Sequence, residues 1–159
     1  MGICLPEDLK IVRVQTVVAC NAFTTSDYIC DKYAHKVWFI IGHAGATDTD
    51  LTLGLREATN VAGGTSAVVA TTFPIWTDID HGVASDALVR QTDAATDVID
   101  PATEGAQLTV FEWDPAKHTA GYDCIAVRAT GGNAANTVWV LALIWERYAQ
   151  DPPPSAIVD

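Results

Sequence analysis

The most regular apolar pattern in the chain lies near its C-terminal end, between residues 136 and 147. Side chains of an extended strand alternate between its two faces, and here both faces would be apolar. One face would carry Val138, Val140, Ala142 and Ile144, and the other Trp139, Leu141, Leu143 and Trp145. A helix could bury the same run, but β-branched residues and tryptophan favour a pleated surface, and Gly131–Gly132 supply a turn before it. The pattern predicts a central strand, covered on one face by the domain's own core and on the other by a second sheet or another subunit.

The same analysis predicts short strands along most of the chain. Alternation is clearest between residues 50 and 58, where leucine occupies positions 51, 53 and 55 and is expected to point inward. Pro74 and the polar run Thr77–Ser85 predict an irregular stretch between strands. The other predicted strands are Ile11–Cys20, Lys36–Gly42, Ser66–Thr72, Ala87–Thr92, Ala106–Trp113 and Tyr122–Arg128, and Asp27–Cys30 and Thr96–Ile99 are two further candidates. Eight or nine short strands without a helical period are typical of an all-β antiparallel two-sheet sandwich, and the jelly roll is its commonest eight-stranded form.

The length of 159 residues fits one domain with extended arms at both ends. We expect an N-terminal arm over residues 1–10, a β-sandwich over 11–148 and an extended, proline-rich tail over 149–159. Consecutive prolines lack backbone donors and prefer the stiff polyproline II form, and the apolar residues after them favour docking over the alternative of a frayed terminus. The candidate partner-binding residues of the tail are Tyr148, Pro152, Pro153, Pro154, Ile157 and Val158.

Composition argues against several classes of function. The chain is 49% hydrophobic and 18% charged, which is the balance of a folded domain. Its net charge of −11, from 20 acidic and 9 basic residues, argues against a nucleic-acid partner or an anionic membrane surface. No stretch approaches the roughly 20 apolar residues of a membrane helix, and the first residues do not resemble a signal peptide. We therefore expect neither nucleic acid nor membrane among its partners.

Residues that could carry catalysis or bind a metal are few. Asp48 with Asp50, and the run Asp78–His81, place carboxylates two residues apart, a spacing that can converge on calcium. Aspartate is also favoured in turns, however, because it bonds its own backbone. The four histidines form no H-x-H or H-E-x-x-H pair, and Gly-x-Ser-x-Gly is absent. We expect no enzymatic activity, no catalytic residue, no cofactor and no metal; a jelly-roll metalloenzyme is disfavoured because leucine and valine occupy the inward positions.

The cysteines and one tryptophan leave alternatives open. Cys4, Cys20, Cys30 and Cys124 show no CxxC spacing, so reduced thiols are expected, with a Cys20–Cys30 bridge across a hairpin as the alternative. Trp76 lies in the stretch predicted to be irregular, where it could anchor a carbohydrate or a partner protein. The alternative for Trp76 is a loop folded over the core.

Five segments resemble, in the same order, a group of small proteins encoded among tailed-phage head genes. The segments are Ser26–Cys30, Ala34–Ile41, Leu51–Gly64, Tyr122–Arg128 and Arg147–Asp159. The resemblance covers most of the chain in short patches and includes no catalytic motif. It implies a β-sandwich virion component, either a head decoration or cement protein or an auxiliary capsid protein.

The expected function is therefore that of a non-enzymatic phage structural protein, which stabilises the head by bridging capsid subunits through Gly2–Lys10 and Asp151–Asp159. Its expected partners are the major capsid protein and copies of itself in a homotrimer. After synthesis in the host cytoplasm it would lie on the capsid exterior, because packaged DNA would repel its acidic charge. The alternative is a β-sandwich binding module for carbohydrate or host surface on the virion, which would use an exposed Trp76.

Overall fold

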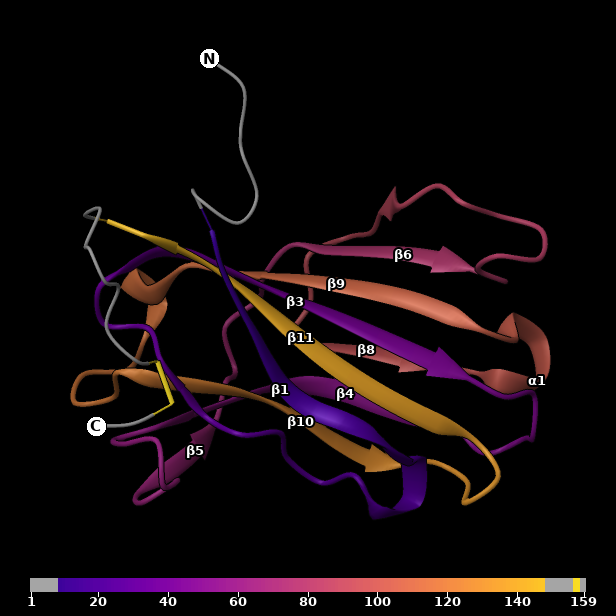
Figure 1. Ribbon diagram of the computed structural model, residues 1–159, viewed down its shortest axis with the longest axis horizontal. Helices are drawn as coiled ribbons and strands as arrows, with labels where there is room; N and C mark the ends of the chain where they lie inside the picture. Colours follow the sequence, from indigo (N-terminus) through magenta and orange to yellow (C-terminus); the bar gives the residue numbers. More distant parts are fainter. Residues whose placement is uncertain (1–8, 148–155, 158–159) are drawn as a thin grey trace.

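Strands with apolar residues at every second position form two facing layers, and the computed structural model shows them as two antiparallel sheets (Figure 1). It describes residues 9–147 and 156–157. The six-stranded sheet has the order β1-β11-β3-β9-β6-β7, with β1 Lys10–Ala19, β11 Thr137–Glu146, β3 Ala34–Ala44, β9 Gln107–Trp113, β6 Ile75–Ile79 and β7 Val89–Arg90. The five-stranded sheet has the order β2-β10-β4-β5, with β2 Ile29–Cys30, β10 Cys124–Gly131, β4 Leu51–Ala58 and β5 Ser66–Val68; β8, Thr96–Ile99, also pairs with β4.

The order of the strands is that of a jelly roll. Strands β1, β11, β3 and β9 form one layer, and β2, β10, β4 and β8 form the other, so the chain alternates between the sheets at most of its turns. Eight strands in these two orders make the double Greek key of the jelly roll. Strands β5, β6 and β7 lie between β4 and β8 in sequence and widen both sheets. The predicted all-β sandwich of jelly-roll type is confirmed.

The core lies between the two sheets. Leu51, Leu53 and Leu55 of β4 are fully buried, as their alternation predicts. Facing them, β11 buries Val138, Val140, Ala142 and Ile144. Three aromatic residues pack together in this core. The ring centre of Phe73 lies 5.0 Å from that of Phe111 and 6.5 Å from that of Trp113.

Three short helices interrupt the connections between strands. They are the 3-10 turns η1, Cys20–Ala22, and η2, Pro115–Lys117, and the single-turn helix α1, Pro101–Glu104. Asp100 and Asp114 cap α1 and η2 by accepting the backbone N–H of Ala102 and Ala116, and a proline follows each cap. A side-chain acceptor followed by proline is a typical helix start, although both helices end within one turn.

The stretch predicted to be irregular contains a strand instead. Ile75–Ile79 forms β6, which pairs with β9 from Ile75↔Phe111 to Ile79↔Gln107. Pro74 stands just before β6, where a strand tolerates proline, and its carbonyl accepts the N–H of Glu112 at 3.0 Å. Conversely, the predicted strand Ser66–Thr72 ends at Val68, and Ala87–Thr92 shrinks to Val89–Arg90.

Candidate functional site

The outer face of the six-stranded sheet, on the side away from the core, is largely apolar. Two neighbouring rows of side chains cross it in register from strand to strand. The first row is Arg13, Leu141, Ile40, Val110, Trp76 and Arg90. The second row is Ile11, Leu143, Trp38 and Glu112. Trp139 and Trp145 of β11 extend these rows at either end, and we call this set of residues the outer face.

Tryptophan is concentrated on the outer face. Of the five tryptophans in the chain, only Trp113 points into the core. Trp38 and Trp145 stack, with ring centroids 6.4 Å apart and planes at 18°, and Trp145 remains 44% exposed. The indole of Trp139 lies over Gly42, where a Cβ would come within 2.2 Å of the ring. The second sheet covers the valine face of β11, as predicted, whereas the described residues leave its tryptophan face partly exposed.

The polar groups of the outer face are paired with one another. Glu112 accepts the indole N–H of Trp38 at 2.9 Å and forms an ion pair with Lys36. The guanidinium of Arg90 lies 4.8 Å from the ring centre of Trp76. These contacts leave apolar surface between a few paired charges, which is the composition of a protein interface core.

Trp76 does not occupy the loop that the sequence predicts. It belongs to β6, opposite Val110 and Arg90, and it is half-buried beneath the arginine. Its indole is therefore part of a sheet surface and not of a free loop, and the binding module that would use an exposed Trp76 stays a prediction. A hollow of ≈ 250 Å³ does indent the outer face, between β1 and β11, and is lined by Arg13, Val17, Trp139 and Leu141 among others.

The charge of the outer face differs from that of the whole chain. Its basic side chains are Arg13, Arg90 and, opposite Trp145, Lys36. Its acidic side chains are Glu112, Asp93, which forms an ion pair with Arg90, and, in register at its margin, Asp78. The chain carries 20 acidic residues against 9 basic ones. The acidic excess therefore lies elsewhere on the molecule, and another chain can approach this face with little repulsion.

A second cluster of functional groups surrounds His118, which follows η2. One ring nitrogen of His118, Nδ1, lies 3.2 Å from Oε2 of Glu57, and the other, Nε2, lies 2.8 Å and 3.0 Å from the two carboxylate oxygens of Asp31. The side chains of His118, Asp31 and Glu57 are 7%, 0% and 4% exposed. Trp113 donates its indole N–H to Asp31 at 3.0 Å, and Thr119 donates its backbone N–H to Glu57 at 3.0 Å.

The carboxylates on either side favour the charged imidazolium. Burial alone would lower the pKa of His118, but the hydrogen bonds and attraction of Asp31 and Glu57 raise it above its usual value. Burial likewise opposes ionisation of Glu57, yet the donors Thr119 and His118 hold its pKa below the usual value. Burial has the larger effect on Asp31 and raises the pKa of that carboxyl, although His118 and Trp113 donate to it. The triad fastens the connection between β9 and β10 to the five-stranded sheet.

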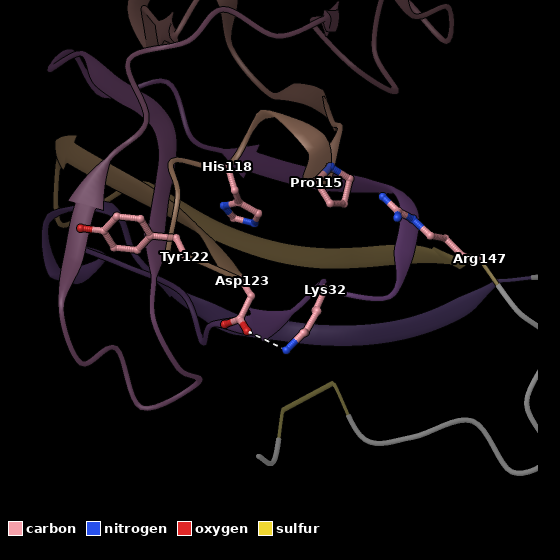
Figure 2. Close-up of a pocket in the computed structure, with 7 residues that line it drawn as sticks. Lys32, Pro115, His118, Tyr122, Asp123 and Arg147 are labelled. Carbon is pink, nitrogen blue, oxygen red and sulfur yellow. Dashed lines mark ion pairs between the residues drawn. The ribbon is translucent and has the colours of Figure 1, made fainter.

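A cavity of ≈ 340 Å³ opens beside this triad (Figure 2). Its walls include His118, Tyr122, Arg147 and the ion pair of Lys32 with Asp123, at 3.8 Å. Arg147 is held in place by its Nε–H, which donates to the carbonyl of Ala34 at 2.9 Å. Both ring nitrogens of His118 are hydrogen-bonded to carboxylates, which fixes the orientation of the imidazole at the wall of this cavity.

No sequence motif includes His118. Its partners stand 61 and 87 residues away in the chain, so no local spacing marks the cluster. The one available indication is Glu57, a carboxylate in an otherwise apolar stretch of β4.

The two acidic segments considered as calcium sites, Asp48 with Asp50 and Asp78–His81, differ in their surroundings. Carboxylate oxygens of Asp48, Asp50 and Asp100 gather within 4.8 Å of one another on exposed or half-exposed loops. Asp78 instead forms an ion pair with His81. Exposed acidic groups often gather without a cation, so this proximity does not by itself make a metal site.

Part of the C-terminal tail contacts the sandwich. Ala156 is 4% exposed, and its carbonyl accepts the backbone N–H of Cys30 at 2.7 Å, on the edge of β2. Ile157 is 51% exposed. The remaining tail candidates, Tyr148, Pro152, Pro153, Pro154 and Val158, lie outside the described residues.

Comparison with protein-family models, curated proteins and solved structures finds no match to this chain. Within residues 9–147 and 156–157, none of the helices has the length and apolar character needed to cross a membrane.

Proposed function

We propose that this protein is a non-enzymatic structural subunit of a tailed-phage virion, a head decoration or cement protein that assembles through its outer face with further copies of itself. The observation that carries the proposal is the outer face, an apolar sheet surface rich in tryptophan on an otherwise acidic chain. Monomeric proteins rarely expose contiguous apolar surface beyond a few hundred Å². A surface of this composition therefore calls for a protein partner.

The chemistry of the face favours a second copy as the occupant. Tryptophan and arginine dominate the residues that carry binding energy in protein interfaces, and here Trp38, Trp145 and the Trp76–Arg90 pair lie on one face. Basic and acidic side chains nearly balance on this face, whereas the whole chain carries −11, so two copies can meet here with little repulsion. Closed oligomers use such a face repeatedly, and a trimer fits a protein at the local three-fold axes of a capsid.

The virion assignment rests on the fold and on the resemblance described above. Jelly rolls recur in viral capsid and lectin domains, which supports the assignment as an analogy of fold. The net charge of −11 suits the outside of a head, away from packaged DNA. In this arrangement the outer face joins copies of the chain, and other surfaces and the two ends of the chain contact the major capsid protein.

The test is addition of the purified chain to heads of the same phage assembled without it. We expect the wild-type protein to co-sediment with the heads to a saturating ratio and to raise their resistance to heat. Leu141→Lys, which places a charge at the centre of the outer face, should bind markedly less. Val98→Lys is the matched control, because Val98 is 49% exposed on β8 of the other sheet. Wild-type protein that stays in solution at every concentration contradicts the proposed function.

A further inference from the structure

Two cysteines that are distant in sequence face each other across the five-stranded sheet. Cys30 of β2 pairs directly with Cys124 of β10. Next to this pair, Asp31 donates its N–H to the carbonyl of Asp123 at 3.0 Å, whereas the N–H of Cys30 turns away from β10 and donates to Ala156. Cys30 and Cys124 thus form a non-hydrogen-bonded pair, the type in which opposite side chains come closest.

The backbone at this pair suits a disulfide as it stands. Opposite Cα atoms in non-hydrogen-bonded pairs are about 4.5 Å apart. Disulfides accept Cα separations of about 4.4–6.8 Å. The two side chains leave the sheet on the same face, because they are in register. The register of the two strands therefore allows a bond between the two sulfur atoms.

The environments of the two thiols differ in the way that thiol–disulfide exchange requires. Cys30 is partly exposed, whereas Cys124 is fully buried. The Cys124 thiol lies next to Cys30 and lowers the pKa of Cys30 to about 7, while the same interaction and burial raise the pKa of Cys124. The Sγ of Cys124 also lies 3.7 Å from a carboxylate oxygen of Asp123, to which the thiol can donate. An accessible thiolate next to a second, protected thiol is the arrangement of a redox-sensitive cysteine with its resolving partner.

We propose that Cys30 and Cys124 are a redox modification site that takes a small disulfide such as oxidised glutathione as its oxidant. The Cys30 thiolate attacks one glutathione sulfur, forms a mixed disulfide and releases the first glutathione as its thiolate. Cys124 then loses its proton and attacks the Cys30 sulfur, which releases the second glutathione. The protein loses two electrons and two protons, and both pass to the two glutathione molecules.

The disulfide would fasten the edge of the sandwich on which the C-terminal segment rests. Strand β2 has only two residues, and one of them, Cys30, binds the carbonyl of Ala156 through its backbone. A Cys30–Cys124 disulfide would therefore link the residue that binds Ala156 covalently to β10, which contributes to the core. If the proposed function holds, the chain is made in a reducing cytoplasm and oxidised after the virion is released; the site itself does not depend on that function.

The test uses the full-length protein with Cys4→Ser and Cys20→Ala, so that Cys30 and Cys124 are the only cysteines. After native incubation with oxidised glutathione, we expect loss of both free thiols and an intact mass lower by two hydrogen atoms. Adding Cys124→Ser should stop the reaction at one bound glutathione on Cys30. Adding Cys30→Ser should leave the buried Cys124 largely unreacted.

Three results would overturn the proposal: a stable glutathione adduct while Cys124 is present, two thiols that do not react in the folded protein, or a disulfide between chains on a non-reducing gel. Peptide mapping of the oxidised wild-type chain gives an independent readout that needs no substitution, and there the Cys30 and Cys124 peptides should be linked. All of these measurements are made on the isolated protein, so failure to bind phage heads does not affect them.

Discussion

Replacing His118 with glutamine should be among the most damaging single changes in the chain. The imidazolium bonds two carboxylates, Asp31 and Glu57, that are 0% and 4% exposed and that lose this donor when the ring is removed. Hydrogen bonds to charged groups contribute about 1.5–3 kcal/mol each. Removal of one partner from a buried ion pair typically costs about 3–5 kcal/mol. We expect His118→Gln to lose about 3–5 kcal/mol of the about 5–15 kcal/mol that stabilises a typical domain.

The assay is urea unfolding at pH 6, with both proteins at the same concentration. The midpoint should fall while the slope with denaturant is unchanged, since the same surface is exposed on unfolding. His35→Gln is the control, because His35 is exposed and its ring makes a T-shaped contact with that of Trp145; it should change stability by less than about 0.5 kcal/mol. A loss below about 1 kcal/mol for His118→Gln would refute the assignment of the triad as a buried charged anchor.

The pH dependence of the same variant tests the charge state. The folded-state pKa of His118 is raised, so its stabilisation is fully present below the unfolded histidine pKa of about 6.5 and is lost as the pH rises through the folded value. The folded-state pKa of Glu57 is lowered, so its contribution is present above the usual value of 4.5 and is lost as the pH falls through the folded value. The difference in unfolding free energy between wild type and His118→Gln should therefore shrink as the pH rises above about 6.5. A difference that is constant up to pH 9 would mean that the histidine is neutral.

Three further changes have defined outcomes. Asn136→Ala removes a fully buried amide that accepts the N–H of Thr47 at 3.1 Å and donates to its carbonyl at 2.7 Å; urea unfolding should show a loss of about 2–3 kcal/mol. Leu53→Ala opens a cavity between the sheets, and the same assay should show a loss of about 2–5 kcal/mol. Gly42→Ala places a Cβ within 2.2 Å of the Trp139 ring, so the indole must move, with a change in tryptophan fluorescence and weaker self-association. Unchanged fluorescence in that variant would contradict the packing of Trp139 over Gly42.

The strands that the sequence predicts best are those that bury one clean apolar face. Every second position of β4 and β11 reaches the core. Side chains alternate between the two faces of any strand, so this pattern does not depend on which strands pair with it. Strand β6 escaped prediction because Pro74, Thr77 and Asp78 resemble a loop. In the fold, Thr77 is buried and its hydroxyl accepts a hydrogen bond from Gln91 at 2.7 Å, a partner that no local pattern could supply.

A candidate site could be predicted from the sequence only where a pattern of neighbouring residues marks it. The two apolar faces of β11 indicated the outer face before its neighbours were known. The register of the sheets, by contrast, decides that Cys30 meets Cys124 rather than Cys20, which instead lies against Gly132. It also places Trp76 beneath Arg90 rather than in a free loop. Contacts across long sequence separations depend on register, and single-sequence spacing does not contain it.

The most direct test of the assembly proposal is the mass of the full-length protein in solution, measured by sedimentation equilibrium over a range of concentrations. A trimer or larger closed oligomer for the wild type, with Leu141→Lys reduced to monomer and Val98→Lys unchanged, is the predicted result. A wild-type chain that remains a monomer across the whole range, with its outer face open to solvent, would contradict it.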